Sequence, residues 1–146
     1  IAEVFEQDTT GKGAIGSGYT YSGHPVGAAA AIACLQETER LDVKTNAAAR
    51  GAQMMAGVEA LKAKYDLVGD VRGGHGLMTA LELVSDRATK APIDKATIGK
   101  VQRVTYEAGA MVRVSGPNII LSPPLVLSEA DVDTILSALD AGLAAA

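Results

Sequence analysis

A short polar segment, GSGYTYSGHP at residues 16–25, stands directly before an alanine-rich run. Its glycines allow the backbone to approach a ligand closely, and the hydroxyls of Thr20 and Ser22 can donate hydrogen bonds. A helix that begins at Pro25 would add the positive end of its dipole, so a phosphate or carboxylate could bind there. The alternative, which the residues alone favour, is that Thr20 or Ser22 merely caps this helix.

Arg113 is the second candidate, because it lies in the otherwise apolar stretch AMVRV beside a Ser-Gly-Pro-Asn turn. A guanidinium can hold a carboxylate through two parallel hydrogen bonds. The alternative, again favoured by the residues alone, is an edge arginine that forms a salt bridge or extends its charge into water. For Arg72, in DVRGG, we expect a structural ion pair with a nearby acid.

The remaining polar motifs indicate structure rather than chemistry. GKGAIG at residues 11–16 matches GxGxxG, but more loop follows it where a dinucleotide site needs a helix, so a flexible loop is favoured. His24 is expected to be a structural histidine and Cys34 a small buried side chain. The two histidines and the single cysteine show no metal-ligand spacing, and we expect no metal site.

The composition narrows the class of protein. A length of 146 residues suits one domain with a real core, and 48% hydrophobic residues make the chain globular. A net charge of −4, scattered basic residues and the absence of tryptophan argue against nucleic acid as a partner. No apolar run approaches the ~20 residues of a membrane span, so no membrane is expected. A single cysteine fits a reducing cytoplasm.

The hydrophobic periodicity predicts an α/β layer with short, mostly antiparallel strands. The helix after Pro25 carries such small side chains that we expect it to pack closely against a neighbour. Helices are predicted at 25–40, about 45–64, 93–107 with Gly109 at its end, and from Ser128, which forms a capping box with Asp131. Strands are predicted within 67–84 around Gly73 and Gly74, and in AMVRV and NIILS, with a polar connection at 86–91 and with Pro123 and Pro124 ending the sheet.

Two helices have a clear apolar face. The stripe of the second helix is Met54, Val58, Leu61 and Tyr65, and that of the last helix is Val132, Ile135, Leu136, Leu139 and Leu143. We expect these faces to form the core with the sheet.

Three stretches together resemble one family. GSGYTYSGHPVGAAAAIACLQ, GDVRGGHGLMTALELV and RVSGPNIILSPPLVLSEADVD occur in the order and spacing seen in class III (omega) aminotransferases, particularly the amine:pyruvate and β-alanine:pyruvate type. The resemblance covers nearly all of residues 13–143 and points to the C-terminal third of such enzymes. It implies the C-terminal part of a fold-type-I transferase that uses pyridoxal 5′-phosphate (PLP), a long helix plus a small α/β domain. Residues 1–40 would end the large PLP-binding domain, and residues 41–146 would form the small C-terminal domain.

The resemblance also implies roles for individual residues. Thr20 matches the threonine that reaches across the dimer to the cofactor phosphate of the partner subunit, Tyr19 contributes to the same boundary, and Ser22 remains a candidate cap. Arg113 matches the mobile arginine that grips a substrate carboxylate. The family's Schiff-base lysine would precede Ile1, so no catalytic residue is expected in the chain. VRGGHGLM is one residue longer than the family's VRGxGLM, which predicts a different turn near His75.

The function implied is that of a PLP-dependent transaminase, which transfers an amino group from an amine or ω-amino acid to a keto acid such as pyruvate. The enzyme would be a cytoplasmic homodimer, or a tetramer, with shared active sites. Without the lysine, these 146 residues should not catalyse transamination alone. The alternatives are a non-catalytic proteolytic fragment and an anion-binding or dimerisation module.

Overall fold

The computed structural model describes Glu3, Gln7 and residues 18–146. The GKGAIG stretch, with Lys12, lies outside the described residues. The chain divides into two compact units, Ile1–Glu37 and Thr38–Ala146.

In the first unit, a turn over residues 20–23 leads into helix α2 (Pro25–Arg40), as predicted. Every residue of α2 is exposed, so the expectation of a closely packed helix is wrong for the chain as described. Cys34 is likewise exposed rather than buried. The physical reason is that alanine side chains bury area only under a covering surface, which the sequence of a helix does not itself supply.

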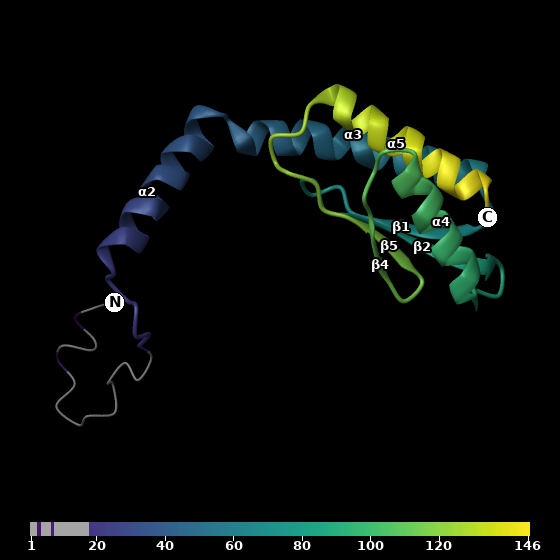
Figure 1. The fold of residues 1–146 in the computed structure, drawn as a ribbon, viewed down its shortest axis with the longest axis horizontal. Coiled ribbons are helices and arrows are strands. Elements are labelled where there is room, and N and C mark those ends of the chain that lie inside the picture. Colours follow the sequence, from purple (N-terminus) through teal and green to yellow (C-terminus); the bar gives the residue numbers. More distant parts are fainter. Residues whose placement is uncertain (1–2, 4–6, 8–17) are drawn as a thin grey trace. The chain divides into compact units, whose positions relative to one another are not determined.

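The second unit is a sheet with helices on one face, confirming the predicted α/β layer (Figure 1). Helix α3 packs against β1 and β2, α4 contacts β4, and α5 lies against both α3 and α4. The helices are α3 (Val43–Lys64), α4 (Lys95–Glu107) and α5 (Glu129–Ala144); the strands are β1 (Val68–Arg72), β2 (Thr79–Asp86), β3 (Ala91–Pro92), β4 (Arg113–Ser115) and β5 (Asn118–Leu121).

The strand order is β1-β2-β5-β4, and every pair is antiparallel, as the short strands and tight turns predicted. Strand β3, which was predicted as part of a polar connection, pairs with β2 outside this order. Its Pro92 has no N–H to donate, which suits an edge position. In the β1–β2 turn, Gly74 and Gly76 have φ values of 88° and 71°, a conformation that glycine adopts at little cost.

The helix ends follow from local chemistry. The predicted capping box of α5 is present, with the Asp131 N–H donating to Ser128 Oγ (3.2 Å) and the Ser128 N–H to Asp131 Oδ2 (2.9 Å). Helix α4 ends at Glu107 and Gly109 follows with φ 106°, close to the predicted stop. Its start at Lys95 is fixed by Asp94, which accepts from the N–H groups of the first turn, a cap that the sequence interpretation missed.

The core lies between the sheet and the helices. On α3, Met54, Val58 and Leu61 are buried as predicted, whereas Tyr65 is only partly buried. On α5, Val132, Leu139 and Leu143 are buried, and Ile135 and Leu136 pack against them at the rim. The sheet adds buried residues that alternate along its strands and pair across them as Val71–Leu81–Ile119, Val68–Leu83 and Thr79–Leu121. Among the described residues, no helix is long and apolar enough to cross a membrane.

Candidate functional site

The candidate anion-binding residues of the first unit lie in a tight turn before α2. The Ser22 N–H donates to the Tyr19 carbonyl (2.9 Å), and the Tyr19 N–H donates to Ser22 Oγ (3.3 Å). Gly23 follows with φ 75°, and the His24 N–H donates to the Tyr21 carbonyl (3.1 Å). The hydrogen bond of the Ser22 hydroxyl therefore closes the turn rather than capping α2.

Thr20 is the turn residue whose side chain is still available. It is exposed, and its hydroxyl has no hydrogen bond with any residue that the structure describes. Tyr19 beside it is 80% exposed. A hydroxyl donor close in sequence to the N-terminus of a 16-residue helix has the chemistry that a phosphate group requires.

The candidate residues of the second unit lie on the sheet face that points away from the helices. Cross-strand pairing places Arg72, Ala80, Ile120 and Arg113 in one row across β1, β2, β5 and β4. A neighbouring row consists of Asp70, Glu82, Asn118 and Ser115. We call these eight residues the outer face. Because paired residues share a side of the sheet, their side chains project together.

Arg72 is bound into the outer face by three hydrogen bonds, which confirms the predicted ion pair. Its Nη1 donates to Glu82 Oε2 (2.6 Å) and Asp70 Oδ2 (3.2 Å), and its Nη2 donates to Asn118 Oδ1 (2.6 Å). The hydrogen bond to Glu82 is the main cause that raises the pKa of Arg72 above its ordinary value. Partial burial raises the pKa of Asp70, but hydrogen bonds from Lys62, from the Val71 N–H and from Arg72 outweigh it and lower that pKa.

Arg113 differs from the other arginines of the chain. It is exposed, and its guanidinium has no hydrogen bond or ion pair with any described residue. Each of the other five arginines has an interaction within the chain: Arg40, Arg50, Arg72, Arg87 and Arg103. The alternative of a salt-bridged edge arginine therefore finds no partner among the described residues.

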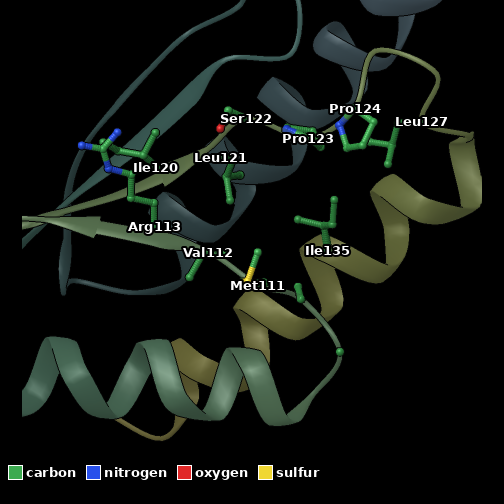
Figure 2. A pocket seen from close by; sticks show the side chains of 12 residues that line it. Met111, Val112, Arg113, Ile120, Leu121, Ser122, Pro123, Pro124, Leu127 and Ile135 are labelled. Carbon is green, nitrogen blue, oxygen red and sulfur yellow. The ribbon is translucent and has the colours of Figure 1, made fainter.

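A pocket of about 510 Å³ borders Arg113 at the edge of the sheet (Figure 2). Arg113 and Ile120 project side by side, and the Arg113 side chain points away from Met111 and Ile135. The lining is mostly apolar and comes from the segment before β4, the end of β5 and α5: Gly109, Ala110, Met111, Val112, Arg113, Ile120, Leu121, Ser122, Pro123, Pro124, Leu127 and Ile135.

The structure divides the expected site residues between its units, with Thr20 and Tyr19 in the first and Arg113 in the second. It also brings Arg72 into one row with Arg113, although 41 positions separate them, and adds Glu82 and Asn118, which sequence analysis did not identify. In the sequence, the only indication of their role is that Glu82 and Asn118 are polar residues within predicted apolar strands. No group of three His, Cys, Asp or Glu side chains in the described part of the chain could hold a metal ion.

Comparison with known proteins shows which family the chain belongs to. Residues 1–143 match the family model of class III aminotransferases. An uncharacterised aminotransferase of Sinorhizobium fredii is 38% identical over 94% of the chain, and the taurine–pyruvate aminotransferase of Bilophila wadsworthia is 34% identical over 83%. The chain covers 30% and 28% of these two relatives.

Solved structures that resemble the chain are transaminases, like the relatives found by sequence. A PLP-bound amine transaminase from an uncultivated Pseudomonas species superimposes with a TM-score of 0.89, at 43% identity over 99% of this chain and 33% of that one. An (S)-enantioselective omega-transaminase from Thermomicrobium roseum gives a TM-score of 0.83 at 32% identity, over 98% of this chain and 31% of that one.

The mixed α/β fold with its small antiparallel sheet is thus that of the C-terminal portion of a fold-type-I transferase. The chain belongs to the class III aminotransferases, a PLP-dependent family, and amine and omega-transaminases are among its structural neighbours. It spans about a third of the length of the solved structures that it matches.

Proposed function

We propose that the full-length protein is a transaminase that passes an amino group from an amine or ω-amino acid to a keto acid such as pyruvate. Membership of the class III aminotransferases supports the reaction, and the neighbouring amine transaminases support the substrate class. We further propose that residues 1–40 end the large PLP-binding domain, that residues 41–146 form the small domain, and that two subunits share each active site.

The observation that carries the substrate proposal is the free guanidinium of Arg113. It is exposed on the outer face and has no acidic partner among the described residues, so its two-pronged donor group is available to an external carboxylate. A keto acid such as pyruvate presents that carboxylate. The Arg113 side chain is exposed, so it is free to turn aside when an amine without a carboxylate binds instead.

The proposed role of the first unit is to hold the cofactor phosphate. The Thr20 hydroxyl would hold a phosphate oxygen of the partner subunit's cofactor, and Tyr19 would border the same position. PLP, when bound, supplies the electron sink that makes amino transfer possible. The lysine that moves the proton is proposed to lie outside the 146 residues. What this chain contributes is therefore the binding of two anionic groups, the phosphate and the substrate carboxylate.

The proposal is tested by Arg113→Ala in the full-length protein, with Arg103→Ala as a matched control. Arg103 is exposed and makes only an i,i+4 ion pair with Glu107, 2.9 Å. Because charge-assisted hydrogen bonds contribute about 1.5–3 kcal/mol, loss of Arg113 should raise the KM for pyruvate about 10- to 100-fold. The KM for a neutral arylalkyl amine should change little. Equal effects on both substrates would contradict carboxylate recognition.

The cofactor role is tested separately by Thr20→Ala and Thr20→Ser. Loss of the hydroxyl should speed release of PLP during dialysis, measured as cofactor content against time, and serine should preserve retention because it keeps the donor. Unchanged retention in Thr20→Ala would rule out the phosphate contact.

A further inference from the structure

Two side chains and one backbone carbonyl on the outer face form a series of hydrogen bonds that ends on the hairpin carrying Arg113. Arg72 on β1 donates through Nη2 to Asn118 Oδ1 (2.6 Å), and Asn118 Nδ2 donates to the Ser115 carbonyl (3.1 Å). Ser115 is the last residue of β4, two positions after Arg113. This series of hydrogen bonds therefore connects β1 and β4, the two outer strands of the order β1-β2-β5-β4.

Strand β4 is short, and beyond β5 its main contact is with α4, whose Gln102 Nε2 donates to the Val112 carbonyl just before the strand (3.1 Å). It has three residues, lies at the edge of the sheet and pairs only with β5. The turn that joins it to β5 contains Gly116 with φ 58° and Pro117, whose carbonyl accepts from the Leu83 N–H of β2 (2.9 Å). The amide of Asn118 closes this turn from the outer face, so it is the side-chain contact that sets the orientation of β4 at the Ser115 end, and with it the base of the Arg113 side chain.

Arg72 is suited to hold Asn118 in one orientation. Its planar guanidinium contacts Glu82 Oε2 (2.6 Å) with one nitrogen and Asn118 Oδ1 with the other, which also fixes which end of the amide faces the Ser115 carbonyl. A lysine has a single nitrogen and cannot reproduce this fork. Arg72 forms ion pairs with Asp70 and Glu82, so its guanidinium is not available to an external anion. In its row, that leaves only the guanidinium of Arg113.

We infer that Arg72 and Asn118 are positioning residues that set the placement of Arg113 for binding the substrate carboxylate. The inference rests on the proposed function, since it assigns them an effect on the substrate only through Arg113. Neither residue is expected to touch the substrate. Their effect should appear in the affinity for the keto acid and not in the turnover of a neutral amine.

The experiment uses the full-length protein with Asn118→Ala, Arg72→Lys and Arg113→Ala. The matched control is Asp94→Ala. Asp94 caps α4 by accepting from the N–H groups of Ala96 (2.9 Å) and Thr97 (2.9 Å), and it neither touches the β4–β5 hairpin nor lines the pocket beside Arg113. Each variant is measured for the KM of pyruvate, the KM and kcat of a neutral amine, and the melting temperature.

Asn118→Ala and Arg72→Lys should each raise the KM for pyruvate about three- to tenfold, the effect of one misplaced hydrogen-bonding group, with amine kinetics nearly unchanged. Asp94→Ala should lower the melting temperature through the lost helix cap without changing either KM. In the Arg113→Ala background, Asn118→Ala should raise the pyruvate KM no further, because two residues that act through one contact are not additive.

The outcomes separate the two proposals. If Arg113→Ala leaves the pyruvate KM unchanged, carboxylate binding by Arg113 fails, and the inference fails with it. If Arg113→Ala raises that KM but Asn118→Ala and Arg72→Lys do not, only the positioning role is overturned. A rise caused by Asn118→Ala that persists in the Arg113→Ala background also overturns it, since the effect would then not pass through Arg113.

Discussion

The contact between α4 and α5 predicts that replacing glycine by alanine has opposite effects on the stability of the protein at two positions. Gly142 on α5 is buried, and a methyl group there would collide with Thr105 Oγ1 and lie 2.8 Å from the Val101 carbonyl oxygen, both on α4. Gly99, also on α4, is exposed and has no atom within 4 Å of the position that a methyl group would take. Gly142→Ala and Gly99→Ala are therefore chemically identical changes in different surroundings.

The expected magnitudes follow from these contacts. In an unobstructed helix, replacing glycine by alanine stabilises by about 0.5–1 kcal/mol, which is the expectation for Gly99→Ala. At Gly142 the same gain is opposed by overpacking, which costs about 1–3 kcal/mol and is not easily relieved because the Val101 carbonyl belongs to the backbone. The difference is a net destabilisation of up to about 2.5 kcal/mol, with about 1–2 kcal/mol as the central expectation for Gly142→Ala.

The assay is the melting temperature of the full-length protein, compared among the wild type and both variants. Adding Thr105→Ala to Gly142→Ala should recover part of the loss, because it removes the hydroxyl that collides; the hydroxyl is buried without a hydrogen-bond partner among the described residues. If Gly142→Ala melts at or above the wild-type temperature, as Gly99→Ala should, the close packing of α4 against α5 is wrong.

Three further predictions concern stability. Met54→Ala should destabilise by about 2–5 kcal/mol in denaturant unfolding, because Met54 is fully buried and the core would retain a cavity. Arg87→Met should lower the free energy of unfolding by about 1–3 kcal/mol, because Arg87 Nη2 lies within hydrogen-bond distance of three backbone carbonyls near the end of α3, at 2.6, 2.7 and 2.9 Å. The exposed ion pair of Arg103 contributes less, so Arg103→Ala should lower it by under about 1 kcal/mol. Hydrogen bonds from the Ser128 side chain and backbone hold the pKa of Asp131 below its ordinary value, so its contribution is present above the unfolded pKa and is lost as pH falls through the folded one. Asp131→Asn should accordingly make the fall in melting temperature below about pH 4 less steep.

Much of the second unit could be predicted from local sequence because its signals are local. Ser128 with Asp131 marks the start of α5, and Gly109 marks the end of α4, since caps depend on residues a few positions apart. The same reasoning missed β3, whose two residues are too few for an alternating pattern, and placed the start of α3 near Thr45 rather than at Val43.

Burial in the first unit could not be predicted in the same way. The small side chains of α2 indicate that the helix can be closely packed, but burial is a property of two surfaces, and the sequence of one helix describes only one of them. The exposed α2 and Cys34 show the difference, because a pattern of small residues is the same whether or not a neighbour covers it.

By itself, the sequence determined the kinds of element, their order, the family resemblance and Thr20, Tyr19 and Arg113 as the residues to test. Tertiary structure alone decided which side chains share the outer face, that Arg72 is bound to Glu82 and Asn118, and that Arg113 has no partner among the described residues. The physical reason is that secondary structure depends on residues a few positions apart, whereas the partner of a charged side chain on a sheet depends on strand order and register, which join positions as distant as 72 and 118.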